Sequence, residues 1–206
     1  MLDSTEFGYG GFTFNWGDHV CAFFDDHMQQ MEVLAPFVSV GIQLGQRCAW
    51  IAPEPSCNAL RRALAEMGGD LATLEASGQL LIMPDPEFYL HEGVFEPDRT
   101  MDLVRALLGD SQRQGYPAMR MCNDVSWLGG GRVDAELWEE FELTLTEAIT
   151  NLPLCLVCAY DRRQVSGSIL VAAIRTHPVM VVGTNFRANP FYEPGPAGFG
   201  GVREVI

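Results

Sequence analysis

The chain of 206 residues contains no lysine, so its 13 basic residues are all arginines. They stand against 27 acidic residues, and the formal net charge is −14. Nucleic acids and anionic membranes attract proteins through positive surface charge. The composition therefore excludes a general affinity for nucleic acid or for a membrane surface.

Long apolar runs are also missing, and no segment is apolar over the length that a membrane span needs. The first residues, MLDSTEFGYGGF, have neither the basic nor the apolar region of a signal peptide. We therefore expect a cytoplasmic protein. The six cysteines fit that compartment, because most of them lie within apolar strand patterns, where reduced thiols are usually packed.

A phosphate-binding loop is absent from the place where a nucleotide-binding α/β domain carries one. Residues 19–24 and 47–52 have the apolar patterns of buried strands. The helix between them begins after Asp25 and Asp26, which can cap it, and ends at Gly45. Its apolar stripe consists of Met31, Leu34, Val38 and Ile42. This strand, helix and strand predict a parallel sheet.

The turn after the first strand argues against nucleotide chemistry. Such a turn needs glycines for close backbone approach and a lysine for the phosphates. Here Asp25 and Asp26 occupy the positive end of the helix, where their carboxylates repel a phosphate. Glu54 and Asp124 follow later strands, where ATPases keep catalytic acids, but capping or loop hydrogen bonds are the usual role of such residues. A residual nucleotide-binding or ATPase domain stays open as an alternative.

Nucleophilic catalysis has no support either. The sequence contains no GxSxG elbow and no recognisable Ser, His, Asp arrangement. We therefore expect a protein that is not an enzyme.

The remaining elements alternate between strand and helix. Strands are predicted at residues 80–83, 118–122, 154–160 and 179–182, and helices begin after Ser56, near Asp98, and after Asp134 and Ser166. The pattern predicts a three-layer α/β fold with a mostly parallel sheet of about six strands and helices on both faces. Residues 1–17 are predicted as an N-terminal arm, residues 18–185 as the domain and residues 186–206 as a tail or linker. Residues 84–97 are predicted as a long aromatic loop, a kind of segment that is often functional.

The helix after Asp134 has an apolar stripe and many acids. Its stripe is predicted to contain Leu137 or Trp138, Phe141, Leu145 and Ala148. Its glutamates are Glu136, Glu139, Glu140, Glu142 and Glu147. We assign these acids to a solvated face, with a docking face for a basic partner as the alternative.

Two predicted strands each place a cysteine on the same face as another side chain that can bind a metal or donate a hydrogen bond. Side-chain alternation puts His19 with Cys21, and Cys158 with Tyr160. If these strands are neighbours, the thiols and imidazoles could join His177 in a metal, haem or thiol redox sensor. The spacing matches no zinc module, however, and buried cysteines are common in sheet cores. Structural packing is the favoured interpretation, so no metal and no cofactor are expected.

Aromatic residues gather near the predicted carboxyl ends of the strands. They are Phe88, Tyr89, Phe95, Trp127, Tyr160 and Tyr192. Open α/β sheets bind ligands in the crevice at that edge, and aromatic walls with a few polar groups suit a small, mostly apolar molecule. We therefore expect a small-molecule pocket there.

An ordered series of segments resembles the MEDS sensory domain, a family named from methanogen and methylotroph signalling proteins and the dichloromethane-responsive regulator. The segments are GDHVCAFFDD, LAPFVSVGIQLGQRCAWIAPE, GYPAMRMCNDVSW, LCLVCAYD, THPVMVVG and NPFY. The similarity runs from about Gly17 to Tyr192. The opening segment also resembles RecA-like ATPases of the circadian-clock type. The resemblance implies a RecA-like fold with a degenerate phosphate loop.

The resemblance also implies a function. It implies a non-enzymatic sensory domain of prokaryotic signal transduction that binds a simple hydrocarbon derivative. The implied partner is a histidine kinase, an anti-sigma-type ATPase or a DNA-binding module, and oligomerisation is left open. Because the sequence carries no output domain, we expect either an excised sensor or one that acts on a separate partner. The positions carried over as ligand-binding residues are His19, Cys21, Tyr89, Arg120, Asp124, Trp127, Cys158, Tyr160, His177, Asn189 and Tyr192.

Overall fold

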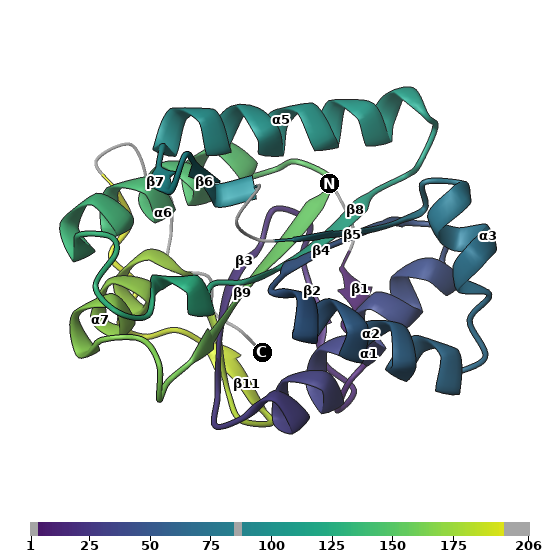
Figure 1. The fold of residues 1–206 in the computed structure, drawn as a ribbon, viewed down its shortest axis with the longest axis horizontal. Helices are drawn as coiled ribbons and strands as arrows, with labels where there is room; N and C mark the ends of the chain where they lie inside the picture. The colour runs from purple at the N-terminus through teal and green to yellow at the C-terminus, as the bar shows by residue number, and fades with distance from the viewer. Residues whose placement is uncertain (1–3, 85–87, 196–206) are drawn as a thin grey trace.

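A large central sheet organises the computed structural model, which describes residues 4–84 and 88–195 (Figure 1). Its seven strands lie in the order β11, β10, β3, β9, β8, β4 and β5. Within this sheet, only the pair of β10 and β11 is antiparallel. The strands are β3 (His19–Phe24), β4 (Arg47–Ala52), β5 (Leu80–Pro84), β8 (Met119–Asp124), β9 (Leu154–Asp161), β10 (Val179–Val182) and β11 (Asn185–Ala188). The predicted α/β fold with a mostly parallel sheet is confirmed.

Helices cover both faces of the sheet, as predicted. One face carries α1 (His27–Gln43), α2 (Glu54–Glu66) and α3 (Leu71–Ala76), and the other carries α5 (Pro97–Arg113), α6 (Ala135–Ile149) and α7 (Gly167–Thr176). In Figure 1, α5 lies above the sheet and α1 and α2 lie below it. Two small hairpins and a 3₁₀ turn complete the fold: β1 (Thr5–Glu6) with β2 (Thr13–Phe14), β6 (Leu90–His91) with β7 (Val94–Phe95), and η1 (Ser126–Leu128). None of the helices in the described part of the chain is long and apolar enough to cross a membrane.

The opening strand, helix and strand lie where the sequence predicts them. β3 and β4 have the predicted bounds, and every residue in both is buried, which explains their continuous apolar patterns. The Asp26 side chain caps α1 by accepting a hydrogen bond from the Gln29 amide. Gly45 follows the helix with a φ of +69°, which glycine adopts without a steric penalty.

Among the helices and the strands of the central sheet, α2, α3 and β11 differ most from the prediction. α2 begins before Ser56, because the Pro53 carbonyl already accepts hydrogen bonds from the amides of Ser56 and Cys57. α3 was not predicted, because it is six residues long and only Leu71 and Leu74 pack against the core, which is too short an apolar stripe to recognise. β11 was not predicted either, since Phe186 is its only residue that is not exposed. This edge strand makes the sheet seven strands wide rather than about six, and it includes the start of the segment predicted as a linker. Residues 196–206 of that segment lie outside the described residues.

The predicted loop at residues 84–97 contains the β6–β7 hairpin. Residues 85–87 of this segment are outside the described part of the chain. The side chains of Phe88, Tyr89 and Phe95 are buried in the core on the α5 and α6 face. The segment therefore packs onto the domain.

The N-terminal arm packs on the opposite face, beside α1, although its residues 1–3 are not described. Phe7 and Phe14 are buried, with ring centroids 4.6 Å and 5.8 Å from that of Phe37. Arg120, from the central strand β8, donates hydrogen bonds to the backbone carbonyls of Phe7 and Phe37. The arm is thus fastened to the sheet through a buried guanidinium group.

The predicted alternation of side chains in β3 and β9 is confirmed. The two strands are neighbours, and Cys21 lies opposite Cys158 in their register. Cys21, Cys158 and Tyr160 face the core under α6 and α7, and His19 contacts Cys158 on the same face. The strands therefore assemble most of the histidine and cysteine group that the sequence suggested.

Candidate functional site

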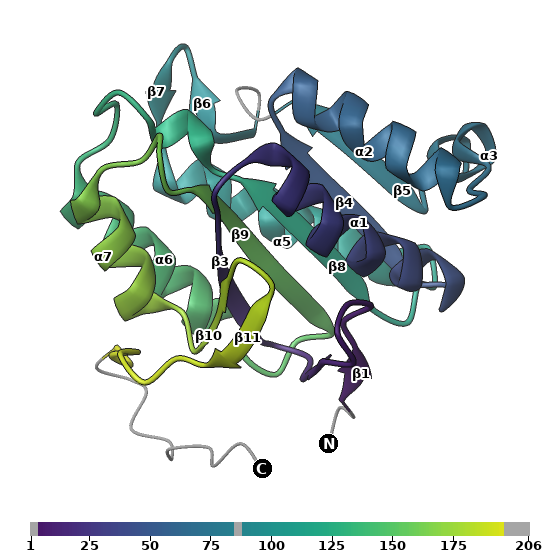
Figure 2. The ribbon, with the colours of Figure 1, turned by 90° about the horizontal axis from the view of Figure 1, so that it is seen from below.

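A cleft of about 270 Å³ opens at the carboxyl ends of β3, β4, β8 and β9, near the start of α1 and α2. Figure 2 shows α1 and α2 lying along one face of the sheet. Its lining residues are Phe24, Asp26, His27, Gln30, Pro53, Pro55, Ser56, Asp124, Ser126, Asp161 and Gln164. The chain leaves β3 through α1 toward β4, but it leaves β9 through α7 toward β10, on the other side of β3. The cleft therefore lies at the topological switch point, where open parallel sheets bind their ligands.

Asp124 is the most buried acid of the cleft. It ends β8 and is 7% exposed. Its Oδ2 accepts a hydrogen bond of 3.0 Å from Gln30 Nε2, and its Oδ1 accepts one of 3.0 Å from the Ser126 amide. Asp124 therefore connects the first turn of α1 with the loop after β8, so a ligand that contacts it acts on both.

Negative charge dominates the cleft. Asp26, Asp124 and Asp161 line it, and no arginine is found among its lining residues in the described part of the chain. Burial alone would raise the pKa of Asp161, but hydrogen bonds from Gln164 and Arg163 outweigh that effect and hold the pKa below its ordinary value. An acidic cleft disfavours phosphate and favours neutral or positively charged ligands.

Arg162 and Arg163, next to the cleft, form ion pairs with aspartates. Arg162 forms an ion pair with Asp25, across the ends of β9 and β3. Glu54, which the sequence offered as a second catalytic acid, does not line the cleft, and it accepts a hydrogen bond from Asn58 one turn later in its own helix. The arrangement that phosphoryl transfer needs, a cation beside a free acid, is thus missing from these residues.

A second polar group, the inner cluster of His19, Glu142, Cys158 and His177, lies between the sheet and helices α6 and α7. The four residues are at most 1% exposed, and one donor atom from each lies within 4.8 Å of all the others. His19 Nε2 is 3.3 Å from Glu142 Oε2 and 3.4 Å from Cys158 Sγ, and His177 Nε2 is 3.5 Å from the same Oε2. Tyr160 donates a hydrogen bond of 3.1 Å to Glu142 Oε1.

Burial shifts the protonation of the inner cluster toward neutral forms. Burial lowers the pKa of His19 well below its ordinary value, and His177 lowers it further. Burial lowers the pKa of His177 to about 3, against the opposing effect of a hydrogen bond to the Ala173 carbonyl. Burial raises the pKa of Glu142 to about 8, although a hydrogen bond from Tyr160 opposes it. The contacts between histidine and glutamate are therefore not ion pairs of two charged groups at neutral pH.

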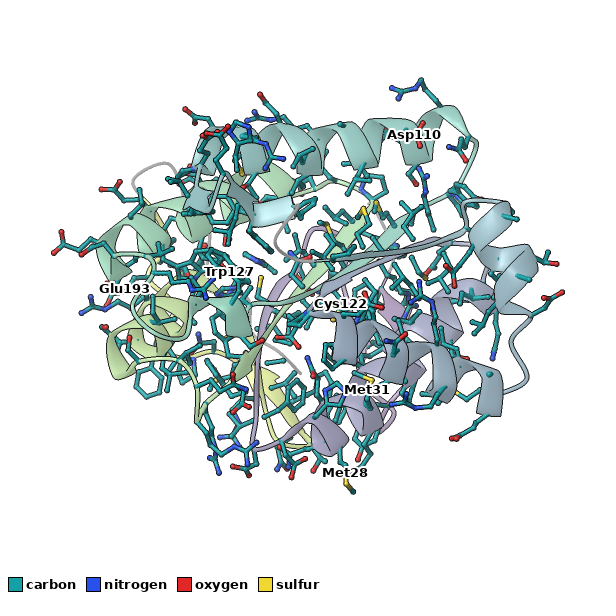
Figure 3. All side chains as sticks on the ribbon, viewed as in Figure 1. Met28, Met31, Asp110, Cys122, Trp127 and Glu193 are labelled. Carbon is teal, nitrogen blue, oxygen red and sulfur yellow. The ribbon has the colours of Figure 1, made fainter. Side chains whose placement is uncertain are left out.

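Tyr89 and Trp127 lie in an aromatic cluster rather than in the walls of the cleft. Their rings stack with centroids 5.0 Å apart, and the rings of Phe95 and Trp138 lie 5.6 Å and 5.7 Å from that of Trp127. Figure 3 shows Trp127 among crowded side chains, whereas Met28 projects outward at the edge of the molecule. The rings fill the space between them, so these two residues belong to the packed core.

The remaining residues of the predicted site are spread over the molecule. Arg120 lies on the face that carries the N-terminal arm. Asn189 donates a hydrogen bond of 2.7 Å to the His177 carbonyl, so it holds the backbone of one inner-cluster residue. Tyr192 lies in a shallow groove on α7. Cys21 lies beside Cys158 in register, but it is not one of the four inner-cluster residues.

Glu142 is the residue that the sequence analysis missed, because it was assigned to a solvated face. That assignment was wrong, since Glu142 is 0% exposed. The helix spacing does hold a signal, because Glu142 lies four residues after Trp138 and three before Leu145, both buried. Of the predicted stripe, Trp138, Phe141 and Leu145 are buried, as predicted, whereas the alternative Leu137 is 40% exposed and Ile149 is buried in place of Ala148.

Comparison with known proteins supports this architecture. Residues 18–178 match the model of the MEDS family, described as the methanogen/methylotroph, DcmR sensory domain. The chain is 21% identical over 169 residues to the transcriptional repressor DcmR of Methylorubrum extorquens, an alignment that covers 81% of this chain and 60% of that protein. The chain thus spans about 60% of the length of this relative.

A solved structure of similar fold is that of a KaiC-like protein from the hyperthermophilic archaeon Pyrococcus horikoshii, with a TM-score of 0.60 at 14% identity. The match covers 88% of this chain and 81% of that one. At this identity the likeness concerns the fold alone, and it confirms the predicted RecA-like arrangement.

Proposed function

This chain belongs to the MEDS family of sensory domains, and on that basis we propose that it is a non-enzymatic sensor which binds a small hydrocarbon derivative in the cleft at the carboxyl edge of its sheet. The observation that carries the proposal is the combination of a cleft at the switch point with an acidic turn in place of a phosphate loop. The volume of about 270 Å³ suits a molecule of a few heavy atoms.

The lining of the cleft supports a ligand with one apolar and one polar part. Phe24, Pro53 and Pro55 offer apolar surface, and Asp124 with Ser126 offers acceptors and a hydroxyl group. A small alcohol, halocarbon or amine can use both kinds of surface. The acidic residues disfavour short organic acids and nucleotides, because burying like charges next to each other is costly.

A path from the cleft to the hairpin β6–β7 runs through η1. Ser126 lines the cleft, and the next residue, Trp127, stacks on Tyr89 and packs against Phe95 of the hairpin. A ligand that shifts η1 therefore changes the packing of residues 88–95. Such a shift signals only if the ligand binds the two arrangements with different affinity.

The output of the sensor is proposed to be a change in the activity of a regulatory partner. The relative in Methylorubrum extorquens is a transcriptional repressor, and this chain matches 60% of it. A DNA-binding module is therefore the partner that the comparison favours, with a histidine kinase or an anti-sigma-type ATPase as the other outputs. The partner can be joined to the sensor or can be a separate protein.

Thermal unfolding with added small molecules tests this proposal. We expect alcohols, halocarbons or small amines to raise Tm, and MgATP and short organic acids to leave it unchanged. A ligand at a hundred times its Kd adds about 2.7 kcal/mol to the free energy of unfolding, which corresponds to roughly 5–10 °C for a domain of this size. A rise in Tm with MgATP alone would contradict the proposal and would identify an unconventional nucleotide-binding domain.

The variant Asp124→Asn and a matched control, Asp102→Asn, test whether the ligand binds in the cleft. Asp124 is held inside the cleft, whereas the Asp102 side chain is 76% exposed on α5. For a small amine, we expect Asp124→Asn to remove most of the rise in Tm, because it removes the buried negative charge. Asp102→Asn should leave the rise unchanged. Equal effects of the two substitutions would place the ligand elsewhere.

A further inference from the structure

The donor atoms of the inner cluster have the spacing of a metal coordination shell. A tetrahedral site with bonds of about 2.0–2.3 Å has edges of about 3.3–3.8 Å between its ligand atoms. The contacts of His19 Nε2 with Glu142 Oε2 and Cys158 Sγ are 3.3 Å and 3.4 Å, and that of His177 Nε2 with Glu142 Oε2 is 3.5 Å. Three of the contacts among the four ligand atoms thus have the lengths that a bound ion would impose, and all four atoms lie within 4.8 Å of one another.

The imidazoles are oriented so that both present a lone pair to the centre. His177 Nδ1 lies 2.8 Å from the Ala173 carbonyl, which can only accept, so the proton is on Nδ1 and Nε2 is free. Thr146 Oγ1 lies 2.8 Å from the carbonyl of Thr176 and 2.7 Å from His19 Nδ1. Its single hydrogen goes to a carbonyl, so Thr146 accepts from His19 Nδ1, and His19 Nε2 also carries a lone pair.

Two buried atoms of the cluster lack a hydrogen-bond partner. They are Glu142 Oε2 and His177 Nε2, and both belong to residues that are 0% exposed. A buried polar atom without a partner costs free energy. A cation placed between them satisfies both atoms. Second partners already hold the outer atoms of these side chains, as is usual around metal ions.

We propose that His19, Glu142, Cys158 and His177 bind a first-row divalent metal ion of the Zn²⁺ class in a closed, four-coordinate site. Two imidazoles, a thiolate and a carboxylate are ligands that this class of ion prefers. The two positive charges of the ion are balanced by one thiolate and one carboxylate. The filled site therefore has no net charge and can be buried without a counter-ion. Binding releases the thiol proton of Cys158 and any proton on Glu142 to solvent.

The position of the site gives it a structural role. His19 begins β3, Glu142 is on α6, Cys158 is on β9 and His177 precedes β10. A bound ion therefore joins neighbouring strands to the helix layer above them. Four protein ligands leave no open position for a substrate, so this is a site for stability or for metal-dependent regulation. The site is distinct from the cleft, and the proposal of metal binding does not depend on the proposed small-molecule binding.

Cobalt substitution tests the proposal directly. The full chain is unfolded with a chelator, refolded with Co²⁺ and passed over a desalting column. We expect one cobalt per chain, visible absorption bands of tetrahedral Co²⁺ and a near-ultraviolet band for charge transfer from thiolate to cobalt. A refolded chain that retains no cobalt, or cobalt without the thiolate band, would overturn the proposal, and neither result depends on a variant.

A pair of cysteine variants then assigns the ligand. Cys158→Ala should abolish the thiolate band, whereas Cys21→Ala, its neighbour in the strand register, should leave both the band and the stoichiometry unchanged. A band that survives in Cys158→Ala would contradict the assignment. Glu142→Gln keeps the side-chain shape but removes the anionic oxygen, so metal affinity should fall by more than about 100-fold.

The threonine behind His19 gives a separate check of positioning. Thr146→Val removes the acceptor of the His19 Nδ1 proton, and metal affinity should fall by about 10- to 100-fold while the absorption bands stay in place. Unchanged affinity in Thr146→Val would show that the deduced orientation of His19 is wrong.

Discussion

Replacement of Arg120 by methionine is expected to lower the free energy of unfolding by about 3–5 kcal/mol. Arg120 is 0% exposed, and its guanidinium group donates to Gln46 Oε1 and to the carbonyls of Glu6, Phe7 and Phe37. Methionine fills a similar space but leaves these buried acceptors without donors. It also frees the N-terminal arm, which the guanidinium group holds against the sheet.

Urea unfolding of the variant measures this effect, with Arg105→Met as the matched control. Arg105 is 63% exposed and pairs with Asp102 on the surface of α5, so its replacement should change the free energy of unfolding by less than about 0.5 kcal/mol. A loss of under about 1 kcal/mol for Arg120→Met would contradict the structural role. In that event, the ligand-binding role that the family resemblance implies for Arg120 would have to be tested instead.

Replacement of Trp138 by alanine is the second change with a large expected effect, again about 3–5 kcal/mol. Trp138 is 0% exposed, and its ring lies within 5.7 Å of the rings of Phe95, Trp127 and Phe141. Its Nε1 also donates a hydrogen bond of 3.3 Å to the Tyr160 hydroxyl. Alanine leaves a large cavity and removes that donor, and the packed aromatic cluster cannot close over the gap completely.

The result distinguishes a packed core from a ligand pocket. The neighbouring Leu137→Ala is the control, because Leu137 is 40% exposed on the same helix and its truncation should cost less than about 1 kcal/mol. If the aromatic cluster were instead an open binding pocket, Trp138→Ala would cost little and would alter ligand binding. Denaturant midpoints of both variants, with and without added small molecule, separate these outcomes.

The backbone arrangement follows from local patterns in the sequence. β3, α1 and β4 are fixed by continuous apolar runs, a capping Asp26 and a terminal Gly45, all of which act within a few residues. Strand alternation also predicts that His19 and Cys158 share a face. β11 is not predicted from the sequence, because an exposed edge strand that pairs on one side needs few buried side chains and so lacks an apolar pattern.

Local sequence patterns do not predict the whole inner cluster. A glutamate on an amphipathic helix is normally solvated, so its sequence context assigns Glu142 to the surface. Its burial depends on partners from β3, β9 and the segment before β10, which only the tertiary fold brings together. For the same reason, Tyr89 and Trp127 have the composition expected of pocket walls, but the fold packs them against each other. Periodicity predicts which side chains share a face of a helix or strand. Whether that face is buried, and against which residues, depends on the element that packs against it.

Amide hydrogen exchange with and without the small molecule that most raises Tm tests the central claim, that ligand binding in the cleft changes the conformation of the domain. The account predicts slower exchange at the cleft rim, in residues 24–30 and 161–165. It also predicts altered exchange in residues 88–97, where Tyr89 and Phe95 pack against Trp127, the residue after the cleft-lining Ser126. Exchange that stays the same in both regions at a saturating concentration would contradict the claim that this domain is a sensor.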